Sequence, residues 1–533
     1  MLSLSLALSL SLIACSGSDE AEDMEEVETE DDAVAEAPRG KGKRGKGKRG
    51  RGGGDEKAGD DTKVPGDGPR RRVSTAPGTG TVTNGSIDFG GAENVATVEK
   101  SSGRMVSKLP TSKCFHTTAT PIVVGEWLLF GTHKKKSQGD GGNRKYEGCN
   151  DDTVESALYA VSAKTGEAHV IGGGLDAEAA ASWGDDKLWV PLVGGGGLAI
   201  WDGGDTRVKR PINAATDSAG LWDDARDRYI FGSVNVPQPV CQGTNGDPRP
   251  DCGCVVAVDA DGTVHASADR RNGLRGWIAA GPTGTSDAYY VGLGNGEDGE
   301  NSLKGNPMRA CDLVKLRPDL TVEASYDDGI EGCSPLGRVK SAVVGEVPIV
   351  DGKLWVQYLG STDGQGVTPI VQLNADDLSV VCRAEIPARS NASVASFYQA
   401  PVVDERGNAY VASERLESQR TSSLYRITPD CSVTRLVDGS DHRVGTPTLA
   451  DDKWVLFGDA GKLHVVDRDS GKTTSHALGS DAGVIGGAVI TRYGVSVVSV
   501  DNTVTTFTDL GISGYGKAPW PRFRKTNTGD AFE

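Results

Sequence analysis

The chain has 533 residues, of which 73 are glycine, 25% are charged and 37% are hydrophobic. Its formal net charge of −17 argues against a nucleic-acid-binding protein, because domains that bind nucleic acid are usually basic. Beyond the first 15 residues, no apolar run approaches the roughly 18 residues that span a bilayer, which excludes a polytopic membrane protein.

Residues 1–14 are a short run rich in Leu and Ser, and Cys15 follows them. The last residues of this run, Leu12-Ile13-Ala14-Cys15, resemble the lipobox of bacterial lipoprotein signal peptides. The resemblance implies cleavage before Cys15 and lipidation of its thiol. Because Ser16 stands where an aspartate would retain a lipoprotein at the inner membrane, we expect the outer membrane, facing the periplasm or the cell surface. An ordinary secretory signal with an incidental cysteine is the alternative.

Residues 15–85 show no hydrophobic periodicity, and their composition predicts a disordered, charged tether. Residues 19–32 contain ten acidic side chains, and residues 39–51 contain eight basic ones separated by glycine. A basic block of this kind is suited to anionic lipid headgroups or cell-wall polymers. The alternative is a solvated spacer in which the two blocks attract each other.

The rest of the chain repeats one pattern: a small or Pro-containing apolar run, a turn with Asp or Gly, then an aromatic strand. The eight copies span residues 120–131, 181–190, 219–232, 280–292, 347–356, 400–411, 446–458 and 487–498. A second half adds two more alternating strands to each copy, as in Leu463–Asp467 followed by Ser470-Gly471. Period-two alternation with Asp/Gly turns is typical of short antiparallel strands.

Four strands in each of eight copies predict an all-β fold, a β-propeller of eight blades over residues 86–533. A ring of seven blades with one irregular repeat is the alternative. Residues 132–151, 236–253, 294–310 and 360–368 are predicted to be loop insertions.

Two segments resemble the PQQ-like, or quinoprotein-like, β-propeller repeat. In the first, Leu463–Lys472, Asp467 and Gly471 stand at the expected places. The second is Ala518-Pro519-Trp520-Pro521-Arg522-Phe523-Arg524 with Thr528-Gly529. The sequence departs from that family because the tryptophan that usually closes each repeat is missing from nearly all copies. In the first copy, for example, His169 and Val170 occupy its region.

Nine cysteines remain besides Cys15, and an exported protein can keep disulfides. The predicted pairs are Cys114–Cys149, Cys311–Cys333 and Cys382–Cys431, the last bridging neighbouring repeats. Cys241 would pair with Cys252 or Cys254 and leave one thiol over. A soft-metal or redox site at Cys241, Cys252 and Cys254 is the alternative.

No catalytic or metal-binding constellation is found among the seven histidines or elsewhere, so we predict that the protein is not an enzyme and holds no cofactor. Binding of Ca²⁺ by carboxylate and carbonyl oxygens of the acidic segments 140–152 and 295–301 is an alternative. The expected function is an outer-membrane-anchored, non-catalytic binding scaffold for envelope proteins or polymers. The chain resembles the lipid-anchored propellers of the outer-membrane β-barrel insertion machinery in its lipobox, its propeller repeats and its lack of a catalytic set of residues. The alternatives are a PQQ-dependent periplasmic dehydrogenase and a lectin-like adhesin. The sequence leaves the oligomeric state open.

Overall fold

The computed structural model describes the following parts of the chain: residues 81–83, 86–110, 115–117, 119–134, 156–177, 179–192, 197–209, 219–233, 254–261, 263–268, 277–294, 313–326, 345–358, 367–387, 400–416, 420–438, 445–459, 461–484 and 486–526. The chain divides into two units, 1–70 and 71–533, and every described residue belongs to the second. The predicted signal peptide, Cys15 and residues 15–80 of the predicted tether lie outside the described residues.

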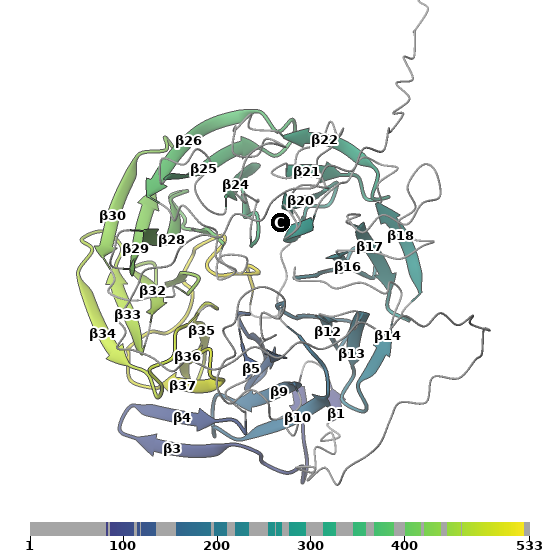
Figure 1. Ribbon diagram of the computed structural model, residues 1–533, viewed down its shortest axis with the longest axis vertical. Coiled ribbons are helices and arrows are strands. Elements are labelled where there is room, and N and C mark those ends of the chain that lie inside the picture. The colour runs from purple at the N-terminus through teal and green to yellow at the C-terminus, as the bar shows by residue number, and fades with distance from the viewer. Residues whose placement is uncertain are drawn as a thin grey trace, which may run out of the picture. The chain divides into compact units, whose positions relative to one another are not determined.

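The described residues form strands and turns but no helix, and eight sheets surround a common axis (Figure 1). The strands of each blade are given from the innermost outward. Blade 1 consists of β6 (Ile122–Val124), β7 (Trp127–Gly131), β9 (Ala157–Ser162) and β10 (Ala168–Gly173), and blade 2 of β11 (Ser182–Gly184), β12 (Lys187–Leu192), β13 (Gly197–Trp201) and β14 (Arg207–Lys209). Blade 3 consists of β15 (Leu221–Asp223), β16 (Arg228–Ser233), β17 (Cys254–Asp259) and β18 (Val264–Ala268), and blade 4 of β19 (Trp277–Gly284), β20 (Tyr289–Gly294), β21 (Leu313–Leu316) and β22 (Val322–Tyr326).

Blade 5 consists of β23 (Ile349–Val350), β24 (Lys353–Gln357), β25 (Val367–Asn374) and β26 (Val380–Pro387). Blade 6 consists of β27 (Val402–Val403), β28 (Ala409–Leu416), β29 (Arg420–Ile427) and β30 (Val433–Asp438), and blade 7 of β31 (Thr448–Ala450), β32 (Trp454–Asp459), β33 (Lys462–Asp467) and β34 (Thr473–Ala477). Blade 8 consists of β35 (Val489–Thr491), β36 (Gly494–Val498), β37 (Thr503–Phe507), β4 (Arg104–Lys108) and β3 (Thr97–Ser101). Two small sheets pair β1 (Thr81–Thr83) with β2 (Ser86–Asp88) and β5 (Phe115–His116) with β8 (His133–Lys134).

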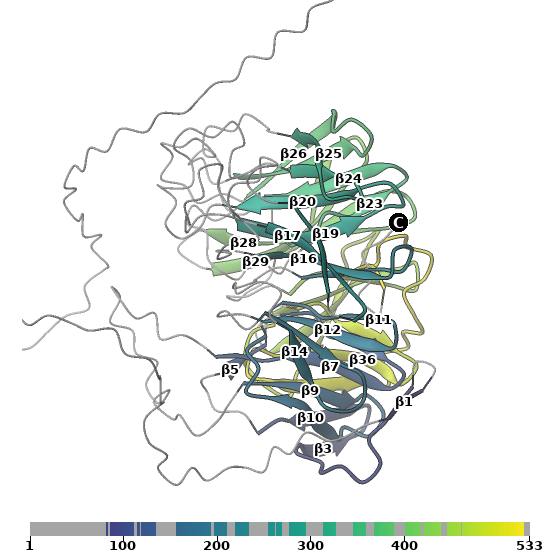
Figure 2. The same ribbon diagram turned by 90° about the vertical axis from the view of Figure 1, so that its right-hand side faces the viewer.

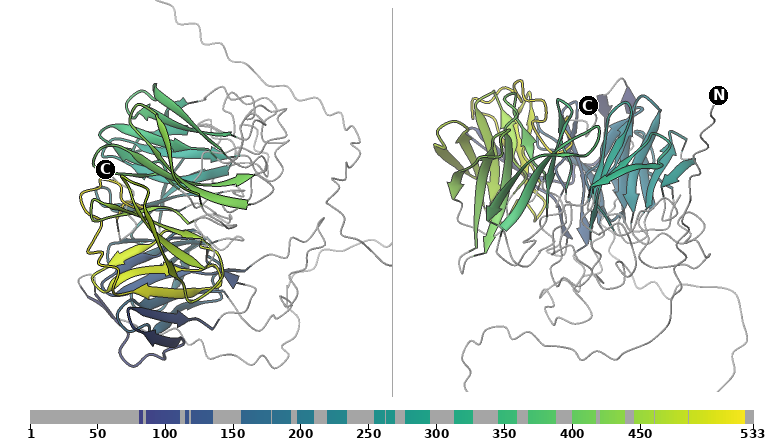
Figure 3. Two further views of the ribbon diagram at one scale, coloured as in Figure 1. Left: turned by 90° about the vertical axis from the view of Figure 1, so that its left-hand side faces the viewer. Right: turned by 90° about the horizontal axis from the view of Figure 1, so that it is seen from above.

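The prediction of an eight-bladed β-propeller is confirmed, and the seven-bladed alternative is wrong. Each of the eight repeat copies forms the two innermost strands of one blade. Figures 2 and 3 view the ring from its edge, where the strands of each blade run between its two faces. Fold and strand pairing therefore define an eight-bladed β-propeller protein.

The eighth blade departs from the repeat pattern, because its own copy supplies only three strands. The fourth strand, β4, comes from the other end of the chain and pairs with β37, with Thr505 opposite Val106. The hairpin partner of β4, β3, then forms a fifth, outermost strand. In Figure 1 these two purple strands lie beside the yellow β37. Pairing of the two ends of the chain closes the ring.

Strand pairing begins before residue 86, because β1 lies inside the predicted tether 15–85 and pairs with β2 in a separate small sheet. The segment after this hairpin packs against blade 1. Trp127 donates a hydrogen bond from its indole nitrogen to the Ile87 carbonyl at 2.9 Å. The Phe89 ring stacks on His169 with centroids 4.6 Å apart. Phe89 thus supplies, from outside the repeat, an aromatic ring at the place where the first copy lacks its tryptophan.

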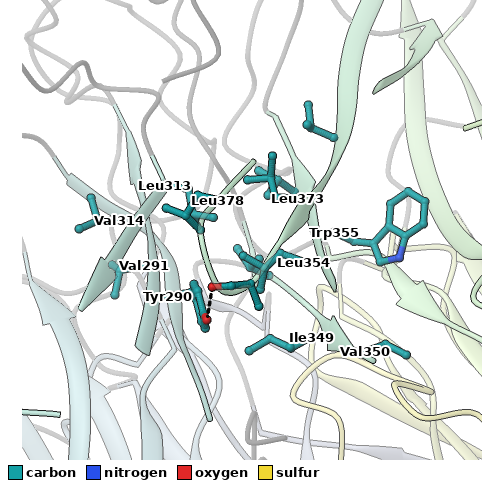
Figure 4. Close-up of a cluster of buried hydrophobic side chains, with 14 of the residues drawn as sticks. Tyr290, Val291, Leu313, Val314, Ile349, Val350, Leu354, Trp355, Leu373 and Leu378 are labelled. Carbon is teal, nitrogen blue, oxygen red and sulfur yellow. Dashed lines mark hydrogen bonds between the residues drawn. The ribbon is translucent and has the colours of Figure 1, made fainter. Parts of the chain in front are cut away.

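Adjacent blades pack through apolar side chains, which is why the inner strands are hydrophobic on both faces. Between blades 4 and 5, for example, Val291, Leu313 and Leu354 are all fully buried (Figure 4). Polar contacts set the register of neighbouring blades at this interface. The Tyr290 hydroxyl donates to the Ala375 carbonyl at 2.7 Å, and Lys315 donates from Nζ to the Asp376 carbonyl at 2.8 Å.

Glycines near the axis let neighbouring innermost strands approach each other closely. A β-carbon at Gly281 would lie 2.5 Å from the Ala219 carbonyl oxygen, and one at Gly486 would lie 2.6 Å from the Ala119 carbonyl oxygen. Both distances are below any normal contact with backbone atoms. Part of the high glycine content is therefore explained by close packing at the centre of the ring, in addition to the tight turns expected from the sequence.

The predicted disulfide Cys382–Cys431 is confirmed. It joins β26 of blade 5 to the turn between β29 and β30 of blade 6 across a sequence separation of 49 residues, with the two Cα atoms 5.9 Å apart. It therefore links neighbouring repeats, as expected. Cys15, Cys114, Cys149, Cys241, Cys252, Cys311 and Cys333 lie outside the described residues, and Cys254 begins β17.

Removal of this bridge should destabilise the propeller without changing its fold. Closing a loop of this length contributes about 4 kcal/mol in the chain-entropy description. We expect the double variant Cys382→Ser, Cys431→Ser to lose up to that amount in denaturant unfolding followed by circular dichroism. The neighbouring variant Ser432→Ala serves as the control. A double variant as stable as the wild type would contradict a stabilising role for the bridge.

Candidate functional site: the insertion face and the sealed axis

All four predicted insertions lie between the second and third strands of their blades. They connect β7 to β9, β16 to β17, β20 to β21 and β24 to β25. Because the strands are antiparallel, each second strand ends at the same face of the ring at which the third strand begins. We call this end of the blades the insertion face, and the opposite end, with the first-to-second and third-to-fourth strand turns, the turn face.

The predicted bounds of the insertions need three small corrections. The insertion 132–151 contains β8, the insertion 294–310 begins with the last residue of β20, and the insertion 360–368 includes the first two residues of β25. Strand pairing continues into each of these segments. Apart from Thr132, the other residues of the insertions lie outside the described residues, and so do the acidic segments 140–152 and 295–301.

The turn face contains short turns that are stabilised by their own internal hydrogen bonds, and the same kind of turn recurs in several blades. Asp319, Asp377 and Asp430 each accept a hydrogen bond from the backbone N–H two residues later, and the intervening residue has a positive φ. Side-chain hydrogen bonds from Thr321, Ser379 and Thr428 are the largest cause that lowers the pKa of these carboxyls in turn. These carboxylates therefore have a structural role in turn formation.

Buried carboxylates also join neighbouring blades near the turn face. Asp404 in blade 6 is fully buried and accepts hydrogen bonds from Asn408 and from the Tyr410 hydroxyl, the latter at 3.0 Å. Arg468 in blade 7 lies 3.6 Å from Asp404 and binds Glu405 through two nitrogens, at 3.0 and 2.6 Å. A buried charge is tolerated only when it is paired in this way.

A similar arrangement joins blades 3 and 4. Asp223, which is fully buried at the end of β15, accepts a hydrogen bond from the Tyr289 hydroxyl of blade 4. Arg228 donates to the same hydroxyl at 2.9 Å. Burial raises the pKa of Tyr289 to about 12, so the hydroxyl keeps its proton for the bond to Asp223 at neutral pH. Both arrangements hold blades together and are not open sites.

The C-terminal segment fills the axis of the ring. Trp520 is fully buried and pairs with Val403 of β27 through two backbone hydrogen bonds, at 2.8 and 3.2 Å. The Pro521 carbonyl then accepts a hydrogen bond from the Leu449 N–H of β31 at 2.7 Å. The chain turns back at Arg522–Lys525, where Lys525 donates its backbone N–H to the Arg522 carbonyl at 3.0 Å.

The turn places Phe523 inside a ring of small side chains. Phe523 is 3% exposed and clusters with Ala119, Ala180, Ala219 and Ala400, which precede the innermost strands of four blades. Small side chains at these positions leave room for one aromatic ring on the axis. The described part of the axis is therefore occupied by the chain itself.

Two buried arginines attach this turn to four blades. Arg522 donates to the Pro121 carbonyl at 2.5 Å, while Arg524 donates to the carbonyls of Gly220 and Pro282, the latter at 3.1 Å. Glu346, immediately before blade 5, is also fully buried and lies 3.5 Å from Arg524. Burial raises the pKa of Glu346, and Arg524 partly offsets this rise.

Sequence reasoning identified the segment 518–524 through its resemblance but missed its contacts. Glu346 was not identified, because a lone acidic residue before a strand carries no signal of an axial partner. His464 lies within β33 and is 9% exposed. Among the described residues, no group of three His, Cys, Asp or Glu side chains is placed to hold a metal ion, and no helix is long and apolar enough to cross a membrane.

No protein-family model and no curated protein sequence matches the chain. Among solved structures, it is similar to the Dos1 propeller, with 12% identity over 75% of this chain and 95% of that one and a TM-score of 0.45. The WD40 β-propeller domain of Doa1 shows 11% identity, coverage of 61% and 90%, and a TM-score of 0.35. The hydrazine synthase of Kuenenia stuttgartiensis shows 13% identity over 62% of this chain and 95% of that one, with a TM-score of 0.40. These values are too low to carry an argument about function.

Truncation of the axial tryptophan should destabilise the whole ring. Removing a large buried aromatic side chain costs about 3–5 kcal/mol, and we expect Trp520→Ala to lose stability in this range in denaturant unfolding followed by circular dichroism. The matched control is Lys517→Ala, which lies three residues earlier in the same segment and is exposed. Equal stability of both variants would show that the segment is dispensable.

Proposed function

We propose that this protein is a lipid-anchored scaffold of the outer membrane whose propeller binds envelope proteins or polymers and which needs no catalysis for that role. The observation that carries the proposal is the placement of all four insertions at one face of the ring. Connections on a rigid scaffold are the usual carriers of binding residues. Several adjacent connections at one face give a larger contact area than any one of them.

The placement also separates binding from folding. The interblade bonds of Asp404, the closure by β4 and the axial contacts of Trp520 all lie outside the four insertions. A change in an insertion therefore leaves these contacts in place. This is the arrangement expected when one surface is adapted to a partner while the ring itself stays constant.

The lipid anchor and the location rest on the Cys15 motif and on the composition of residues 15–85. A chain of about 70 residues without fixed structure has an end-to-end distance of roughly 45 Å, from ~5–6 Å × √n. Such a length would let the insertion face reach partners away from the membrane surface. Attachment through two or three acyl chains is firm, since each buried CH₂ contributes about 0.8 kcal/mol.

We expect replacement of an insertion to abolish partner capture without loss of fold. Residues 295–310 and, separately, 360–366 contain no cysteine and can each be replaced by four Gly and Ser residues. Partners of the wild-type protein are identified by cross-linking in its native cells and mass spectrometry. At least one insertion variant should then capture them at least tenfold less, which is about 1.4 kcal/mol.

The control for this experiment carries Asp185→Asn and Asp186→Asn in the first turn of blade 2, on the turn face. It should capture the partners normally. Undiminished capture by both insertion variants, or loss in the turn-face control alone, would contradict the assignment of binding to the insertion face. Binding of glycans by residues 81–533 would instead favour the adhesin.

The anchor is tested separately by Cys15→Ser. We expect this variant to move from the membrane to the soluble fraction, because only the cysteine thiol can form the thioether that carries the lipid. Ser16→Ala, which keeps the cysteine, should stay with the membrane. If Cys15→Ser partitions like the wild type in fractionation, the protein is held by something other than lipidation.

A further inference from the structure

Three polar side chains form a hydrogen-bonded row across adjacent strands of blade 7. Asp459 ends β32, His464 lies in β33 directly opposite Ser475 of β34, and all three approach each other. The His464 Nε2 atom lies 2.9 Å from Asp459 Oδ2, and its Nδ1 atom lies 2.8 Å from the Ser475 hydroxyl. An acid, an imidazole and a hydroxyl in this order are the components of an activated nucleophile.

Exposure increases along the row in the direction that such a site requires. Asp459 is 1% exposed, His464 is 9% exposed, and Ser475 is exposed to solvent. The imidazole is packed against the ring of Phe457, the residue opposite it on β32, with centroids 5.5 Å apart. The acid is thus shielded, the base is held in place, and the hydroxyl is accessible.

The proton positions follow from the partners. A carboxylate only accepts hydrogen bonds, so His464 carries its proton on Nε2 and donates it to Asp459. The Nδ1 lone pair is then free to accept the proton of the Ser475 hydroxyl. The second oxygen of Asp459, Oδ1, is buried and has no hydrogen-bond partner among the described residues. The hydrogen bond that Asp459 makes through Oδ2 is thus the one to His464.

We propose that Ser475 is a reactive nucleophile that accepts an acyl group from small, activated esters. Its oxygen attacks the ester carbonyl while its proton passes to His464 Nδ1. The carbonyl–alkoxide bond breaks, and the leaving alcohol takes that proton. Water then attacks the acyl-serine in the same way, releasing the carboxylic acid and restoring the hydroxyl. His464 is the general base and Asp459 is a positioning residue.

The position of Ser475 restricts the substrate to a small ester. β34 is the outermost strand of its sheet, so Ser475 is open to solvent on the rim of blade 7. Backbone N–H groups on the outer edge of such a strand have no partner within the sheet and are available to a developing oxyanion. This activity is independent of the proposed binding function, because blade 7 carries none of the four insertions.

The test is covalent labelling of the full chain with a fluorophosphonate, followed by mapping of the modified serine by mass spectrometry. We expect Ser475 to react at least 100-fold faster than Ser379 and Ser432, since general-base catalysis contributes about 10²–10⁴-fold. These two serines are also exposed and hydrogen-bonded to an aspartate, Asp377 and Asp430 respectively, so they are controls within the same molecule.

Variants show whether Ser475 reacts because its hydroxyl is activated by His464 or only because it is exposed to solvent. His464→Gln and Asp459→Asn should both reduce labelling of Ser475 to the rate of Ser379, whereas Thr474→Ala, on the same strand, should leave it unchanged. Circular dichroism confirms that each variant is folded. Labelling of Ser475 at the rate of the two control serines, or labelling unaffected by His464→Gln in a folded protein, overturns the proposal. A loss of partner capture leaves these rates unaffected, so the two proposals fail separately.

Discussion

The structure depends on one geometric constraint: eight innermost strands must meet around a single axis. Small residues satisfy it, since Ala119, Ala219 and Ala400 lie near the axis and Gly281 and Gly486 allow backbone atoms into contact. A ring of eight strands still leaves space at its centre. The C-terminal segment fills this space with Phe523, and the buried guanidinium groups beside it need the carbonyls and the carboxylate that the blades supply.

Most of the fold could be predicted from the sequence because each blade repeats the same local physics. Alternating apolar strands and Asp or Gly turns recur eight times, and each recurrence is one blade. Closure could not be predicted in the same way. The pairing of β4 with β37 joins residues about 400 positions apart in the sequence, and neither strand carries a pattern that identifies its partner. The strand pairing before residue 86 could not be predicted for a similar reason, because β1 is a short, polar strand.

The candidate site can likewise be divided into features that the sequence predicts and features that only the structure reveals. The insertions could be predicted because they interrupt a repeat, but their common face became evident only from the strand order. The disulfide Cys382–Cys431 could be predicted because its cysteines occupy successive copies. Glu346 and the row of Asp459, His464 and Ser475 could not, because these residues carry no motif in the sequence and meet only after the strands have paired.

The two faces of the ring therefore differ in how freely they can change. On the turn face, Asp404 and Arg468 join blades 6 and 7, and the short aspartate turns fix the connections between strands, so a substitution of these residues disturbs the ring. On the insertion face, the long connections begin and end in strands that are already paired. Doubling the length of such a connection costs only about 0.6 kcal/mol in loop entropy. A propeller closed by its two ends and by its axis can thus vary its insertions at little cost in stability, which is the property that a binding scaffold requires.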